Sequence, residues 1–194
     1  MRNFLTVILI LVLFMTLQQG SARAEEDNAS ETGTFTKITS FVKRIFREGD
    51  TALYLSGYAY HLRGVYSEED LKDTNEEAWG GGIGKVLIDE KNRAHELYLF
   101  ASLDSHNHMQ VLSGYIKQWR HSFTDRLSVG AGFTVFIMSR PDIFHGIPFP
   151  GILPVASIEF RPVTLLATYI PTISENTTGK GNVLFVFGRI TFGK

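Results

Sequence analysis

Three side chains of the types that catalyse acyl transfer occur at two distant points of the chain. His61 lies in the last part of an apolar, strand-like segment, and Asp104 and Ser105 follow another such segment. An imidazole can take a proton from a hydroxyl, and a carboxylate can fix its tautomer or stabilise the cation that forms. Whether the three groups act together depends on whether the fold brings these two segment ends together.

The segments that would position these residues alternate between apolar and polar side chains, as strands do. The connections between them alternate between long and short, and the number of strands is even, which is typical of an outer-membrane barrel. The sequence predicts eight strands, at 51–64, 80–90, 94–104, 109–121, 127–138, 152–160, 163–170 and 182–192.

In such a barrel the first and third strands run in the same sense and end on the same rim. The sequence therefore predicts that His61, Asp104 and Ser105 converge there, whereas a solvated rim is the alternative for all three. Adjacent strand residues point to opposite faces, so Asp104 and Ser105 can share a site only if the strand has already turned into a loop. No His, Cys and Asp spacing indicates a zinc site, and we expect no metal or cofactor.

The N-terminus has the features of a secretory signal peptide. A positive Arg2 precedes an apolar stretch at 4–17, and Ala22-Arg23-Ala24 is a cleavage site. Residues 25–194 then form one exported domain without cysteine. Removing Arg2 and Arg23 leaves 17 basic residues against 20 acidic ones, a balance that does not indicate nucleic-acid binding.

A short amphipathic helix is predicted at about 34–48, before a barrel at about 51–192. Apolar residues recur at helical spacing, and the basic residues Lys37, Lys43, Arg44 and Arg47 lie between them. The helix either lies in a membrane interface with its cations near lipid headgroups, or packs as an ordinary surface helix.

One face of the fifth strand is small. Gly130, Gly132 and Thr134 alternate with outward apolar residues, and the second strand is also rich in glycine. Eight-stranded barrels usually fill their interior with side chains. Small inner residues indicate either an apolar void that suits a hydrocarbon chain or close backbone packing at the glycines, and both interpretations stay open.

Nearly the whole mature chain resembles the lipid A palmitoyltransferases of the PagP family. The motifs that carry the resemblance, in family order, are Ala78-Trp79-Gly80-Gly81-Gly82, Asp89-Glu90-Lys91, Asp104-Ser105-x-Asn107, Gly114-Tyr115, Trp119-Arg120, Gly130-x-Gly132-Phe133-Thr134, Leu153-Pro154-x-Ala156-Ser157, Pro162-Val163-Thr164 and Thr168-Tyr169-Ile170-Pro171.

The resemblance implies a monomeric all-β outer-membrane enzyme, an eight-stranded antiparallel barrel after a short helix. It implies transfer of a palmitoyl or similar chain from a phospholipid donor to lipid A, and a link to antimicrobial peptide resistance. The family's essential residues fall on His61, Asp104 and Ser105. His61 is the expected general base, Asp104 would orient it, and Ser105 would be a nucleophile or an oxyanion donor.

The resemblance also implies substrate-binding positions in the wall and floor of the barrel. Pro154 and Pro171 match a lateral opening for lipid. A second opening matches Ser56 and Ala78, where the expected prolines are missing. Gly114 and Ile116 match the floor of the acyl pocket, where Ile116 replaces a glycine and would make the pocket shallower.

Two other classes of protein share much of this pattern. A non-catalytic eight-stranded outer-membrane protein with a defensive or adhesive role needs neither the polar convergence nor the void. A soluble periplasmic lipid carrier with a lipocalin-like barrel needs polar residues on its outer face, and the outward aliphatic residues of the third and fifth strands argue against it.

Overall fold

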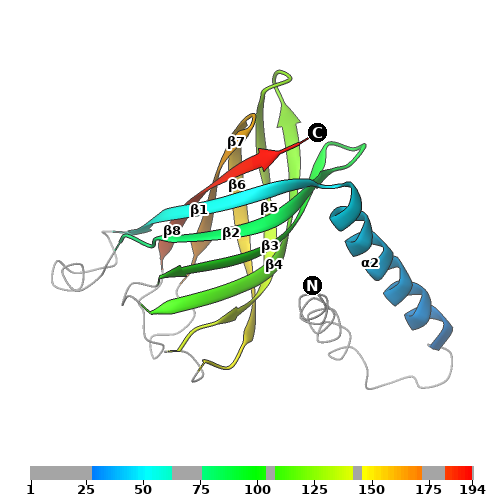
Figure 1. The fold of residues 1–194 in the computed structure, drawn as a ribbon, viewed down its shortest axis with the longest axis horizontal. Coiled ribbons are helices and arrows are strands. Elements are labelled where there is room, and N and C mark those ends of the chain that lie inside the picture. Colours follow the sequence, from blue (N-terminus) through cyan, green and yellow to red (C-terminus); the bar gives the residue numbers. More distant parts are fainter. Residues whose placement is uncertain (1–27, 63–75, 104–107, 142–145, 172–181, 194) are drawn as a thin grey trace.

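The computed structural model describes residues 28–62, 76–103, 108–141, 146–171 and 182–193. Among these residues, one helix precedes eight strands that form a closed antiparallel barrel in sequence order, with β8 paired to β1 (Figure 1). The elements are α2 (Asn28–Glu48), β1 (Asp50–His61), β2 (Gly80–Ile88), β3 (Arg93–Leu103), β4 (Met109–Ser122), β5 (Leu127–Ser139), β6 (Phe149–Phe160), β7 (Val163–Ile170) and β8 (Val183–Phe192).

The predicted fold class, an eight-stranded barrel preceded by a helix, is confirmed. The strand bounds agree with those expected from alternation to within three residues. The helix begins at Asn28, earlier than the expected start at about 34. Apolar periodicity marks only the packed part of a helix, and the polar first turns carry no such signal.

The two rims of the barrel differ. Short turns at 89–92, 123–126 and 161–162 lie on one rim, together with the junction between α2 and β1 (Figure 1); we call this the turn rim. β1, β3, β5 and β7 run toward the opposite rim, which we call the loop rim. Since antiparallel strands reverse at every connection, β1 and β3 both end at the loop rim.

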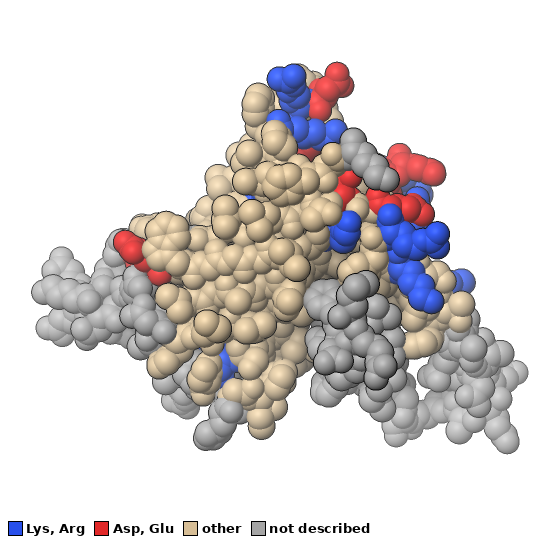
Figure 2. Space-filling model, in the orientation of Figure 1, with Lys and Arg blue, Asp and Glu red and all other residues tan. Residues whose placement is uncertain are grey.

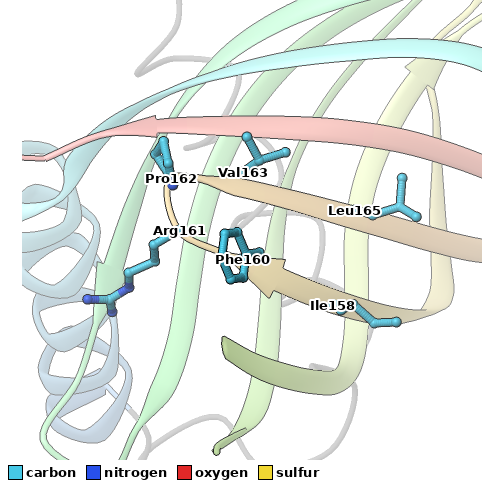
Figure 3. A pocket seen from close by; sticks show the side chains of 6 residues that line it. All are labelled: Ile158, Phe160, Arg161, Pro162, Val163 and Leu165. Atoms are coloured by element: carbon cyan, nitrogen blue, oxygen red, sulfur yellow. The ribbon is translucent and has the colours of Figure 1, made fainter. Parts of the chain in front are cut away.

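The outer wall of the barrel is apolar. Figure 2 shows that charged side chains gather over the turn rim and α2, whereas the visible wall carries almost none. Exposed apolar residues include Leu55, Ile83, Ile152 and Leu165. A shallow apolar groove on the outside of β6 and β7 is lined by Ile158, Phe160, Arg161, Pro162, Val163 and Leu165 (Figure 3). An apolar outward band of this kind is what a barrel presents to hydrocarbon.

Helix α2 packs on the outside of the barrel near the turn rim. Ile45 is fully buried against Leu87 and Leu97, with Phe41 and Phe46 around them. The basic residues between these apolar positions are exposed. No helix among the described residues is long and apolar enough to cross a membrane.

The interior has two layers. An apolar cluster of Tyr54, Tyr98, Phe100, Phe136 and Ile116, joined by Phe185 and Phe187, fills the middle. A charged layer lies toward the turn rim, where Arg189 binds the carboxylates of Glu96 and Glu159. Each of these three side chains is at most 9% exposed.

Two inner glycines lie against the backbone of a neighbouring strand, as the second interpretation of the small inner face expects. A Cβ at Gly132 would lie 1.9 Å from the Lys117 carbonyl oxygen, and one at Gly82 would lie 2.4 Å from that of Leu99. These glycines let neighbouring strands approach closely.

Candidate active site at the loop rim

A β-bulge turns His61 into the barrel. Ala52, Tyr54 and Ser56 are buried, so uninterrupted alternation would place His61 on the outer face. The pairing of β1 with β8 shifts by one residue between Ser56 and Tyr58. A bulge inserts one residue and reverses the alternation beyond it.

The pairs beyond the bulge confirm this orientation. Ala59 lies opposite Phe185, which packs against the interior cluster, and His61 lies opposite Val183. Directly opposite residues of an antiparallel pair share a face. His61 therefore faces the interior at the last position of β1, where it is 5% exposed, while Tyr58 is 44% exposed.

A carboxylate lies beside His61. Glu76 Oε1 is 3.6 Å from His61 Nδ1 and accepts a hydrogen bond of 3.2 Å from the His61 backbone N–H. Glu76 Oε2 accepts a hydrogen bond of 2.8 Å from the Tyr58 hydroxyl. The site therefore pairs a buried imidazole with a carboxylate that is itself held by a phenol.

Asp104 and Ser105 lie outside the described residues. β3 ends at Leu103 on the loop rim, as β1 does at His61. Just inside this rim the Gln110 amide donates a hydrogen bond of 2.9 Å to the hydroxyl of the buried Ser102. These two residues add polar groups to the interior next to the end of β3.

Backbone pairing between β6 and β7 stops before Pro154. The backbone pairing of these strands ends at Val155 and Thr168, although β6 continues to Phe149. The Thr168 hydroxyl donates a hydrogen bond of 2.8 Å to the Pro154 carbonyl oxygen, next to the last backbone pair. Pro171 follows the end of β7 and is exposed, as Pro154 is. The two prolines thus flank a stretch of wall near the loop rim where backbone pairing is missing.

The corresponding seam between β1 and β2 is hydrogen-bonded. Backbone pairing ends at Ser56 and Gly80. Beyond it the Ser56 hydroxyl donates to the Ala78 carbonyl oxygen at 2.6 Å, and the Ala59 N–H donates to the Glu76 carbonyl oxygen at 2.9 Å. These contacts bridge β1 and the segment before β2 at the position that matches a second lateral opening.

Ile116 and Gly114 both face the interior on β4. Ile116 is 2% exposed, belongs to the apolar cluster and lies opposite Glu96, a member of the charged layer. A Cβ at Gly114 would lie 2.7 Å from the Tyr98 hydroxyl, so a larger side chain at this position would clash with Tyr98. Ile116 therefore lies at the boundary between the apolar and charged layers.

The charged layer forms a continuous network. Arg189 donates to Glu96, to Glu159 at 3.1 Å and to the Thr164 hydroxyl at 2.8 Å. Arg120 donates to Glu159 at 2.6 Å, and the Tyr54 hydroxyl donates to Glu96 at 2.8 Å. Because each buried charge is paired, the network can exist inside a narrow barrel, where an unpaired charge would be costly.

A second ionic group lies outside the barrel at the turn rim. Asp89 accepts hydrogen bonds from Arg93 at 2.7 Å and from His95 at 3.2 Å. Partial burial opposes ionisation of Asp89, but these bonds outweigh it and hold the pKa of the carboxyl well below its usual value. This group fixes the turn beneath α2, since the His95 ring contacts Phe41 with centroids 4.9 Å apart. Among the described residues no group of His, Asp and Glu could hold a metal ion.

Sequence reasoning missed Glu76 and Tyr58. Glu76 belongs to an acidic stretch between the first two strands that reads as an ordinary solvated loop, and Tyr58 reads as one more aromatic strand residue. The contact of Glu76 with His61 and that of Tyr58 with Glu76 depend on the bulge and on the path of the chain before β2. Only the residue types, a carboxylate and a phenol near a histidine, were visible in advance.

Comparisons with known proteins agree with this architecture. Residues 41–189 match the family model described as antimicrobial peptide resistance and lipid A acylation protein PagP. The chain is 46% identical over 151 residues to a lipid A acyltransferase PagP of Bordetella pertussis, a match that covers 78% of this chain and 81% of the relative.

Relatives from Legionella carry the same description. One from Legionella longbeachae is 44% identical over 162 residues, 82% of this chain and 68% of the relative. One from Legionella pneumophila is 43% identical over 150 residues, 77% of this chain and 78% of the relative. With a family model that covers most of the barrel and relatives at this identity, the chain belongs to the PagP family.

Proposed function

We propose that this protein is an outer-membrane acyltransferase that moves a palmitoyl or similar chain from a phospholipid to lipid A, with His61 as general base. The observation that carries the proposal is the buried, inward-facing His61 beside a carboxylate at the loop rim of a barrel of this family. An ordinary surface barrel has no need to turn a histidine inward by a bulge.

The reaction is an ester exchange. The imidazole of His61 takes the proton of a lipid A hydroxyl, whose oxygen attacks the ester carbonyl of the phospholipid. The carbonyl re-forms as the ester bond to the lysophospholipid breaks, and the leaving oxygen takes the proton from the imidazolium. Asp104 orients His61, and Ser105 serves as an oxyanion donor or as a nucleophile that carries the acyl chain in between.

Lipid enters from the side and the acyl chain points into the barrel. The unpaired wall next to Pro154 and Pro171 is the proposed entry, because proline cannot donate to the sheet and the backbone pairing ends there. The acyl chain lies along Gly114 and ends near Ile116, because the charged layer beyond Ile116 disfavours contact with hydrocarbon. The apolar outer wall and the expected signal peptide support an outer-membrane location.

The test is mass spectrometry of lipid A from cells that lack their own PagP and express this protein. Wild-type protein should add the mass of one acyl chain. His61→Ala should lose activity by about 10²- to 10⁴-fold, the usual contribution of a general base. His121→Ala is the matched control, because His121 is exposed and lies near the end of β4 on the turn rim, away from His61 on the loop rim.

Absence of the added mass in folded wild-type protein would favour the non-catalytic barrel. Full activity in the His61→Ala variant would exclude His61 as the base while leaving the acyltransferase intact.

A further inference from the structure

Glu76 supplies the hydrogen-bond acceptors that a residue of β2 would otherwise offer to β1. β2 begins at Gly80, so the N–H groups of Ala59 and His61, which alternate toward that side, lack a backbone partner on β2. The Ala59 N–H donates to the Glu76 carbonyl oxygen at 2.9 Å, and the His61 N–H donates to Glu76 Oε1 at 3.2 Å. One residue thus satisfies two donors of β1 and closes the seam.

The same carboxylate reaches the imidazole. Glu76 Oε1 lies 3.6 Å from His61 Nδ1, and the Glu76 side chain is 18% exposed against 6% for His61. Tyr58, on the other face of β1, donates its hydroxyl to Glu76 Oε2 at 2.8 Å. The bulge produces this arrangement, because it places Tyr58 outside and His61 inside with the carboxylate between them.

We propose that Glu76 is a positioning residue, which holds the His61 imidazole in its working orientation and stabilises its protonated form, with Tyr58 fixing the carboxylate. The proposal rests on the proposed function of His61. It adds a second acidic partner to the site, because Asp104 was the carboxylate expected to act on His61. A carboxylate at this distance favours the charged form of a histidine and restrains its ring.

The surroundings of His61 define the experiment. On β8 its neighbour is the apolar Val183, and on β1 the rings of Tyr58 and Tyr60 stack with centroids 6.5 Å apart. Glu76 approaches from the segment before β2, and β3 ends on the same rim at Leu103, the residue before Asp104 in the sequence. The experiment therefore varies both carboxylates, one at a time.

The primary measurement is the titration of the His61 ring by NMR in detergent-folded, isotope-labelled protein, with the His61→Ala spectrum for assignment. Glu76→Gln keeps an acceptor for the His61 N–H and removes the charge. It should lower the His61 titration midpoint by about one pH unit or more, the usual effect of losing an opposite charge at this distance. Asp104→Asn reports the share of the other carboxylate.

Glu77→Gln is the matched control. It makes the same change one residue away, where the Glu77 carboxylate accepts a hydrogen bond from the Trp79 indole at 3.1 Å. The control should leave the His61 midpoint unchanged. A Glu76→Gln midpoint that matches both wild type and the control would overturn the proposal.

Kinetics supply the second measurement. Glu76→Gln should lower kcat about tenfold or more with little change in KM, and Glu76→Asp should restore part of the rate. Tyr58→Phe should show a smaller loss of the same kind. A change in KM alone would mean that Glu76 contacts lipid and does not position the base, which also overturns the proposal.

The two proposals fail in different ways. The titration reports the contact between Glu76 and His61 whether or not the protein acylates lipid A. Failure of the proposed function appears as full activity in His61→Ala, whereas failure of the positioning role appears as an unchanged midpoint in Glu76→Gln. Folding of Glu76→Gln is judged by its heat-modifiable electrophoretic mobility. If this variant does not fold, the same titration on Glu76→Asp should still show a His61 midpoint displaced from that of wild type. An undisplaced midpoint in Glu76→Asp counts against the proposal.

Discussion

Two arginines, one buried and one exposed, bind the Glu159 carboxylate at equal distances. Arg189 Nη2 and Arg161 Nε each lie 3.1 Å from an oxygen of Glu159, but the Arg189 side chain is 2% exposed and the Arg161 side chain 57%. We predict that Arg189→Gln lowers the free energy of unfolding far more than Arg161→Gln does.

The expected magnitudes follow from burial. Two unit charges 3.1 Å apart attract by about 5 kcal/mol at an effective dielectric constant of about 20, and by about 1.3 kcal/mol in water. Removing one partner of a buried pair costs about 3–5 kcal/mol, because the other charge is left buried and unpaired. Arg189→Gln removes the cationic partner of the fully buried Glu96 in this way. The exposed pair of Arg161 contributes about 0.2–1 kcal/mol.

The assay is guanidinium unfolding of both variants and wild type in the same detergent, followed by far-ultraviolet circular dichroism. A double variant, Arg189→Gln with Glu96→Gln, should recover part of the loss, because it removes the stranded charge together with its partner. Equal losses for Arg189→Gln and Arg161→Gln would refute the reasoning that burial, and not distance, decides the value of these ion pairs.

Three further predictions concern the pocket, the turn rim and the wall. Ile116→Gly should shift the lipid A mass increment toward longer acyl chains, and an unchanged increment would contradict a floor at Ile116. Asp89→Asn should destabilise the protein at neutral pH, because the folded-state pKa of Asp89 lies below the unfolded value of 3.8. The difference in unfolding free energy between wild type and variant should shrink as the pH falls below 3.8. A difference that does not change with pH would argue against an ionised Asp89. Leu55→Arg, at an outward position in the middle of β1, should cost about 2–4 kcal/mol on folding into phospholipid vesicles, and folding as efficient as that of Leu55→Phe would argue against a lipid-facing wall.

Much of the fold was predictable from local pattern. Alternation of side chains marks each strand, since successive residues point to opposite faces, and the lengths of the connections distinguish the two rims. The strand at 163–170 was predicted with the bounds that the structure shows. The resemblance to the PagP family placed His61 among the candidate site residues, and the comparisons confirm that family. Catalytic roles for Asp104 and Ser105 stay predictions.

The interior was less predictable, because small residues on an inner face are compatible with a void and with close packing alike. The structure shows close packing at two of these positions, as Gly82 and Gly132 lie against the backbones of their neighbouring strands. The charged layer joins Glu96, Glu159 and Arg189, which come from three separate strands. No local spacing relates them, since only closure of the barrel brings them within bonding distance.

The sequence by itself determined the eight strands, their order and the rim at which β1 and β3 end, because these follow from period, length and alternating direction. The tertiary structure alone decided which way His61 points and what holds it. One inserted residue in β1 reverses the face of every residue beyond it. The carboxylate beside His61 comes from the segment before β2, and its position depends on where the backbone pairing between β1 and β2 ends.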